Sequence, residues 1–173
     1  TFKATEADLD RVLSDDSQAT NVLHFACHGE ADPRQPEYNR IVLGDNVYLT
    51  PWIIRGSDIG KKQPFVFLNA CQVGQGGETL GEYAGFAGAF LKEGCPGFLG
   101  PLWAVDDVIA REVAEQFYTE ACRPDGRTVG EVLRDLRCRF ATLDGAGGRP
   151  AATYLAYVYY GHPNLRLVPL KGA

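Results

Sequence analysis

Two apolar runs that each end in a polar turn constrain the fold of this chain more than any other feature of its sequence. Residues 22–27 (VLHFAC) lead directly into His28 and Gly29, and residues 64–71 (PFVFLNAC) lead into a glycine-rich loop. Nearly continuous apolar runs of this length are typical of buried strands in the parallel sheets of α/β proteins. The two runs therefore predict a parallel pair of strands inside an α/β fold.

The rest of the chain alternates predicted helices with predicted strands. A turn signal at residues 44–46 separates two short apolar runs, which predicts a β-hairpin over residues 41–49 at an edge of the sheet. Further strands are expected over residues 97–103 and 165–168. Helices are predicted over residues 5–20, 78–93, 106–122, 128–143 and 151–160. Strands that alternate with helices predict an α/β sheet that is mostly parallel and flanked by helices.

The composition supports a packed core and excludes several function classes. Of the 173 residues, 45% are hydrophobic and 23% are charged, which is typical of a globular domain. Seventeen Lys and Arg against 22 Asp and Glu give a net charge of −5, so we expect no direct nucleic-acid partner and no membrane partner. The sequence shows neither a signal-peptide pattern nor an apolar run of membrane-spanning length, and we expect a soluble protein.

Cysteine usage indicates the redox environment that the protein needs. The five cysteines are odd in number, include no C-x-x-C pair, and are Cys27, Cys71, Cys95, Cys122 and Cys138. That pattern fits neither a disulfide framework nor a zinc ribbon, so it favours a reducing, cytoplasmic setting. Because the chain contains no Met, we expect it to be an excised domain or a processed piece of a longer protein.

A histidine and a cysteine are predicted to meet at one edge of the sheet. Functional groups of α/β sheets gather beyond the carboxyl ends of the parallel strands, where the first run delivers His28 and the second delivers Cys71. An imidazole can take the proton of a thiol and so produce a nucleophile. The backbone N–H groups of Gly29 and Cys71 are the candidates for an oxyanion hole. The residues therefore predict a His–Cys catalytic dyad.

Other interpretations of the same residues remain open. In one, His28 and Cys71 are a core histidine and an inert buried thiol. In another, His24, on the same strand face as His28, joins these two residues as a metal ligand; the usual spacing motifs are missing, so neither a metal nor another cofactor is expected. The glycine-rich loop at residues 74–77 lacks the lysine of a P-loop, which disfavours a phosphate site.

Two short motifs resemble the signatures of a known family. The sequences HFACHG at His24–Gly29 and LNACQVG at Leu68–Gly74 resemble those of CHAT domains, caspase-like cysteine peptidases related to separase and the caspases. Further segments occur in the order that this family shows, at residues 81–82, 89–94, 102–107 and 117–118. The resemblance spans about residues 20–168.

The resemblance implies a fold, a reaction and a substrate pocket. The fold is a caspase-haemoglobinase-like three-layer α/β sandwich over residues 20–173, preceded by a linker or helix over residues 1–19. The reaction is hydrolysis of a peptide bond in a protein substrate by His28 and Cys71. Asn69, two residues before the nucleophile, is expected to line the pocket for the substrate residue that precedes the cut.

The resemblance also implies a substrate preference. Separase has a Trp-x-Val-x-Asp stretch whose Asp helps to bind a substrate arginine, and Trp103–Asp107 matches that stretch. A carboxylate from Asp107, with Asp106 beside it, is expected to favour Arg or Lys before the scissile bond. The same two residues also fit ordinary caps at the start of a helix.

CHAT domains usually form the effector end of larger proteins, and several serve bacterial defence or regulated proteolysis. The resemblance therefore implies that a regulatory domain or a sensor protein gates the activity, with antiviral defence as one expected setting. The alternative is a catalytically silent, caspase-like interaction module. The presence of both dyad residues argues against that alternative.

Overall fold

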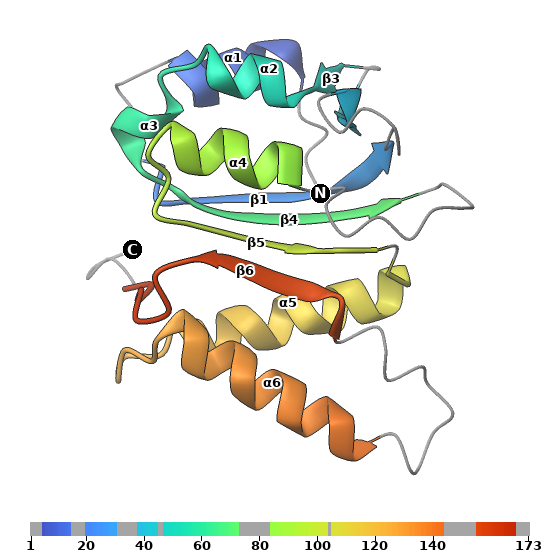
Figure 1. Ribbon diagram of the computed structural model, residues 1–173, viewed down its shortest axis with the longest axis vertical. Coiled ribbons are helices and arrows are strands. Elements are labelled where there is room, and N and C mark those ends of the chain that lie inside the picture. The colour runs from blue at the N-terminus through green and yellow to red at the C-terminus, as the bar shows by residue number, and fades with distance from the viewer. Residues whose placement is uncertain are drawn as a thin grey trace.

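The structure, a computed structural model, is built around one six-stranded sheet (Figure 1). It describes residues 5–14, 20–30, 38–44, 47–72, 84–103, 105–143 and 155–168. The strands are β1 (Val22–Glu30), β2 (Arg40–Val42), β3 (Tyr48–Leu49), β4 (Phe65–Gln72), β5 (Gly97–Pro101) and β6 (Tyr157–Gly161). The helices are α1 (Glu6–Ser14), α2 (Pro51–Arg55), α3 (Ile59–Lys62), α4 (Ala84–Lys92), α5 (Asp107–Ala121) and α6 (Val129–Leu143).

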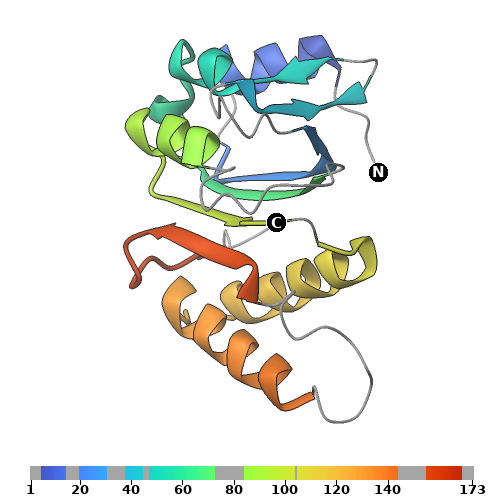
Figure 2. The ribbon, with the colours of Figure 1, turned by 45° about the vertical axis from the view of Figure 1, so that its right-hand side comes forward.

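The sheet is the middle of three layers, and its strand order is β3-β2-β1-β4-β5-β6. Helices α1 to α4 cover one face, and α5 and α6 cover part of the other, as Figures 1 and 2 show from two directions. At the centre β1, β4 and β5 run parallel, whereas β2, β3 and β6 are antiparallel to their neighbours. The predicted three-layer α/β sandwich is confirmed, and the sheet, which the sequence predicts to be mostly parallel, is parallel at its centre and antiparallel at both edges.

Alternation along β4 divides the hydrophobic core into two clusters. Phe65 and Phe67 pack into the cluster under α5 and α6, and Val66 and Leu68 pack into the cluster under α1 to α4. All four side chains are 1% exposed or less. Full burial of such a side chain stabilises the fold by about 1.5–3 kcal/mol. The continuous apolar run that predicts β4 thus reflects a strand that is covered on both faces.

Strand β1 is longer than the sequence predicts. The expected strand ends at residue 27, but β1 continues to Glu30 because its last residues also pair with β2. Glu30 is the register partner of Arg40, and the Nε of Arg40 donates a hydrogen bond of 2.6 Å to the Glu30 carboxylate. His28 therefore lies within a strand and not in a turn.

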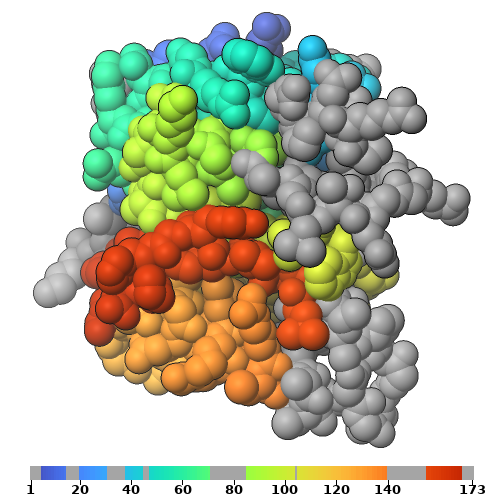
Figure 3. All heavy atoms as spheres, in the orientation of Figure 1, coloured from blue at the N-terminus to red at the C-terminus, as the bar shows by residue number. Residues whose placement is uncertain are grey.

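The helix predicted over residues 151–160 is wrong for residues 157–160, and residues 151–154 lie outside the described residues. Residues 157–161 (YVYYG) form β6, because aromatic and β-branched side chains favour a strand and β5 offers a free edge. Tyr159 covers the paired Gly97 and Gly161, where a Cβ would lie 2.8 Å and 2.5 Å from atoms of its ring and hydroxyl. Figure 3 shows β6 at the surface, between α4 and α6.

Several element boundaries also differ from the predictions. The strand expected over residues 165–168 is reduced to a single bridge between Thr128 and Arg166. The helix expected over residues 5–20 ends at Ser14. The short helix α2 was not predicted; Pro51 begins it, and the Thr50 hydroxyl accepts a hydrogen bond from the backbone N–H of Ile53. The predicted hairpin is confirmed as β2 and β3.

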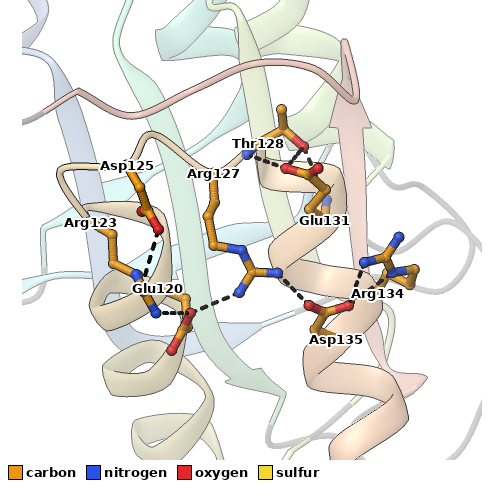
Figure 4. Close-up of polar contacts among 8 residues, drawn as sticks. All are labelled: Glu120, Arg123, Asp125, Arg127, Thr128, Glu131, Arg134 and Asp135. Carbon is orange, nitrogen blue, oxygen red and sulfur yellow. Dashed lines mark hydrogen bonds and ion pairs between the residues drawn. The ribbon is translucent and has the colours of Figure 1, made fainter.

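An ion-pair network holds the turn between α5 and α6 (Figure 4). Arg127 lies between Glu120, at 2.8 Å, and Asp135, to which it also donates a hydrogen bond. Thr128 and Glu131 form a capping box: the Thr128 backbone N–H donates to the Glu131 carboxylate at 2.9 Å, and the Glu131 N–H donates to the Thr128 hydroxyl at 3.2 Å. These bonds fix where α6 begins and how it returns along α5.

No helix in the described part of the chain combines the length and the apolar character needed to cross a membrane.

Candidate functional site

The parallel pairing of β1 and β4 brings the predicted dyad positions together. In the register of the two strands, His28 is the Cα partner of Cys71. Neighbouring strands lie about 4.8 Å apart, so the two backbones are adjacent near the carboxyl ends of both strands. The side chain of Cys71 and residues 73–83, which follow β4, lie outside the described residues.

The two faces of β1 have different surroundings. Leu23 belongs to the cluster under α1 to α4, and the half-buried Cys27 packs against that cluster. His24, Ala26 and His28 lie on the opposite face and are exposed. This exposed face of β1 looks toward the side of the sheet that carries α5, and it forms one wall of a pocket.

The pocket has a volume of about 540 Å³ and lies between β1, β4 and α5. Its lining residues are His24, Ala26, Cys27, His28, Asn69, Asp107, Ala110, Arg111, Ala114, Glu115 and Tyr118. The α5 residues among them recur at spacings of three and four, so they form a single face of that helix. Of the predicted site residues whose side chains the structure describes, His28, Asn69 and Asp107 line this pocket.

The ring of His24 lies at the end of the pocket that is farther from Cys71. Its ring stacks on Phe67, with centroids 4.9 Å apart and planes at 15°, and it lies 5.5 Å from the ring of Tyr118. His24 keeps part of its surface exposed, and the two packed rings remove water from the part of the imidazole that they cover. This desolvation lowers the pKa of His24, which favours the neutral imidazole.

Asn69 lies at the base of the pocket, but its amide is bonded to the protein. The Nδ2 of Asn69 donates a hydrogen bond of 2.9 Å to the backbone oxygen of Ala110 in α5. The Oδ1 of Asn69 accepts a hydrogen bond of 2.7 Å from the hydroxyl of Tyr157 in β6. Asn69 is only 8% exposed. It therefore lines the pocket as predicted, while two of its polar positions hold α5 and β6.

The two neighbouring aspartates at the start of α5 have different roles. Asp106 is the N-cap, and its carboxylate accepts hydrogen bonds from the N–H groups of Val108, at 2.9 Å, and Ile109, at 3.3 Å. Asp106 does not line the pocket, whereas Asp107 does. The helix-cap interpretation thus holds for Asp106, and a pocket carboxylate is left to Asp107.

Charged residues of α5 continue along the rim of the pocket. Arg111 and Glu115 form an exposed ion pair of 2.7 Å one turn after Asp107. Sequence reasoning missed both residues, together with Tyr118. Their spacing from Asp107 along a predicted helix is the signal that could have found them, because positions three and four apart share one helix face.

The predicted oxyanion-hole residues both lie in the sheet. Gly29 is the register partner of Ile41 on one side and of Gln72 on the other, and Cys71 is the partner of His28. Their N–H groups are therefore close to the dyad positions, and their role as oxyanion donors stays a prediction.

The described side chains do not include that of Cys71, so the alternative metal site at His24, His28 and Cys71 is not tested. Within that set, no three His, Cys, Asp or Glu residues gather closely enough to hold a metal ion.

Comparison with known proteins gives one match. The family model described as "CHAT domain" matches residues 1–150 of the chain. A comparison with curated proteins found no match.

Proposed function

The chain belongs to the CHAT domain family, as its motifs predict, and we propose that it is a cysteine endopeptidase with Cys71 as nucleophile and His28 as general base. The family is caspase-like and related to peptidases. The observation that carries the proposal is the register of β1 and β4, in which His28 and Cys71 are Cα partners beside a pocket. Nucleophilic catalysis by a cysteine requires a thiol and a base that can take its proton, and the two adjacent strands carry both.

The proposed reaction has two steps. In the first, His28 takes the thiol proton of Cys71, and the thiolate attacks the carbonyl carbon of the scissile peptide bond. Negative charge develops on the carbonyl oxygen, where the N–H groups of Gly29 and Cys71 are proposed to stabilise it. The C–N bond then breaks, and His28 gives the proton to the leaving amine. In the second step, a water molecule that His28 deprotonates hydrolyses the acyl-enzyme and restores the thiol.

Asp107 supports a preference for a basic residue before the scissile bond. It lines the pocket from the first turn of α5. A carboxylate on a pocket wall attracts a guanidinium or ammonium group through a charge-assisted hydrogen bond. We propose that the substrate is a protein cut after Arg or Lys, and that a neighbouring domain or sensor protein regulates the cut.

Replacement of Cys71 tests the proposed activity. We expect Cys71→Ala to lower the rate of peptide cleavage by about 10³-fold or more, because no other group replaces the nucleophile. The measurement is hydrolysis of a peptide library, together with labelling by a thiol-directed peptide inhibitor. Cys138→Ala, which removes an exposed thiol on α6, is the matched control and should cleave like the wild type. Cleavage retained in Cys71→Ala would overturn the assignment of Cys71 as the nucleophile. A wild-type chain that neither cleaves nor is labelled at Cys71 would favour the silent interaction module.

Replacement of Asp107 tests the proposed preference. We expect Asp107→Asn to reduce the ratio of kcat/KM between an arginine peptide and its citrulline analogue by about tenfold or more, because the charge-assisted bond is lost. Asp106→Asn is the control: it removes the same charge one residue away, and Asn still caps a helix. An unchanged ratio in Asp107→Asn, or a wild-type preference for apolar residues, would overturn the assignment.

A further inference from the structure

A buried chain of hydrogen bonds links three elements at the base of the pocket. The hydroxyl of Tyr157 in β6 donates to Oδ1 of Asn69 in β4 at 2.7 Å, and Nδ2 of Asn69 donates to the backbone oxygen of Ala110 in α5 at 2.9 Å. Tyr157 is 2% exposed and Asn69 is 8% exposed. Ala110 also lines the pocket. The chain of bonds thus joins the floor of the pocket to its α5 wall.

Apolar side chains would stabilise this part of the core better than the buried amide of Asn69 and hydroxyl of Tyr157 do. The surrounding cluster contains Phe67 and Leu99, and a polar group buried among such residues has a desolvation cost that its hydrogen bonds must offset. A paired amide has a fixed side-chain orientation, because each of its two hydrogen bonds requires a defined geometry. The Asn69 amide is therefore held in one orientation, two residues before Cys71.

Tyr157 is itself fixed from a fourth element. The guanidinium of Arg137 in α6 donates a hydrogen bond of 2.6 Å to the backbone oxygen of Tyr157. On its other side Tyr157 pairs with Pro101 in β5, and its ring meets Phe67 edge to face at 6.0 Å. The hydroxyl that reaches Asn69 is thus carried on a side chain with little freedom to move.

We propose that Tyr157 is a positioning residue for substrate: through Asn69 it holds the α5 wall of the pocket at a set distance from β4. Asn69 then acts as a structural joint of the pocket, and charge selection is left to the wall residue Asp107. This inference rests on the proposed peptidase function. It gives the edge strand β6 an indirect part in catalysis, because Tyr157 acts through Asn69 and not by contact with the reacting atoms.

Tyr157→Phe is the direct test, because it removes the hydroxyl alone. We expect kcat/KM for an arginine peptide to fall about tenfold, mainly through KM, since small displacements of positioning groups have large effects on rate. Alkylation of Cys71 by iodoacetamide, followed by mass spectrometry, should keep its wild-type rate because this small reagent needs no pocket. Tyr159→Phe is the matched control: it removes a hydroxyl from the same strand that donates to His162 at 3.0 Å outside the pocket.

A double-mutant cycle tests whether Tyr157 acts through Asn69. If it does, Tyr157→Phe should cause no further loss of kcat/KM in an Asn69→Ala background. If the fold-losses in kcat/KM of the two single variants multiply in the double variant, the inference is overturned. A Tyr157→Phe variant that cleaves like the wild type would also overturn it. A wild-type chain without Cys71-dependent cleavage would instead overturn the proposed function, and the inference with it. If Asn69→Ala does not fold, the comparison of Tyr157→Phe with Tyr159→Phe decides alone.

Discussion

Neighbouring polar residues in this protein differ because their surroundings differ. Asp106 and Asp107 belong to one acidic pair, yet the first caps α5 and the second faces the pocket. His24 and His28 lie on one face of β1, but the ring of His24 is stacked on Phe67. Residue type and strand parity predict the face on which such a side chain lies. They do not predict which residues pack against that side chain, because those residues are distant in sequence.

The stacked imidazole of His24 makes stability depend on pH. Its pKa is lowered in the folded protein, so the unfolded chain binds a proton at a higher pH than the folded chain does. The stabilisation is complete above the ordinary pKa of 6.5 and is lost as the pH falls from there toward the folded pKa. His24→Phe retains a ring and cannot titrate. We therefore expect its Tm to decline less than that of the wild type between pH 7 and pH 5.

The wild-type protein provides the comparison for His24→Phe. Equal declines in the wild type and in His24→Phe would contradict the assignment of this pH dependence to His24.

At the scale of elements, strands and helices follow the sequence where local and tertiary preferences agree. The helices α5 and α6 begin and end within one or two residues of their predicted limits, because apolar spacing and caps both favour them. Residues 157–161 form β6 because β5 offers a free edge and because the side chain of Tyr159 packs over Gly97 and Gly161. Sequence alone does not reveal that a neighbouring edge is vacant.

The capping box of α6 gives a prediction at this scale. We expect Thr128→Ala to lower the free energy of unfolding by about 1 kcal/mol, because the N–H of Glu131 loses its acceptor. Thr128→Ser should retain most of the stability, since it keeps the hydroxyl. Urea denaturation of the three proteins measures the difference, and equal losses for Ala and Ser would show that the hydroxyl is unimportant.

The same capping box responds to acid. Hydrogen bonds from Thr128 lower the pKa of Glu131 in the folded protein. The stabilisation from this carboxylate is therefore present above its ordinary pKa of 4.5 and is lost as the pH falls through the folded value. The difference between the wild type and Thr128→Ala should shrink accordingly in acid.

For the molecule as a whole, the sequence predicts the three layers and the pairing of β1 with β4 better than it predicts the pocket. Two apolar runs and the parallel-sheet rule predict that His28 and Cys71 meet at one edge of the sheet. The register that makes them Cα partners comes from the structure. The α5 wall could be predicted only as a helix face, because its distance from β1 depends on the packing of two separate core clusters. The contribution of Tyr157 could not be predicted, since its hydrogen bond with Asn69 joins residues 88 positions apart.

The bond between Tyr157 and Asn69 also has a consequence for the order in which the protein matures. The two residues are 88 positions apart, so the contact is among those that a growing chain makes late. During synthesis β1, β4 and α5 can assemble first, with the Asn69 oxygen still without its tyrosine partner. With the proposed role of Tyr157, the pocket is complete only when β6 has left the ribosome and docked, so a nascent chain carries the proposed nucleophile Cys71 well before it can hold a substrate.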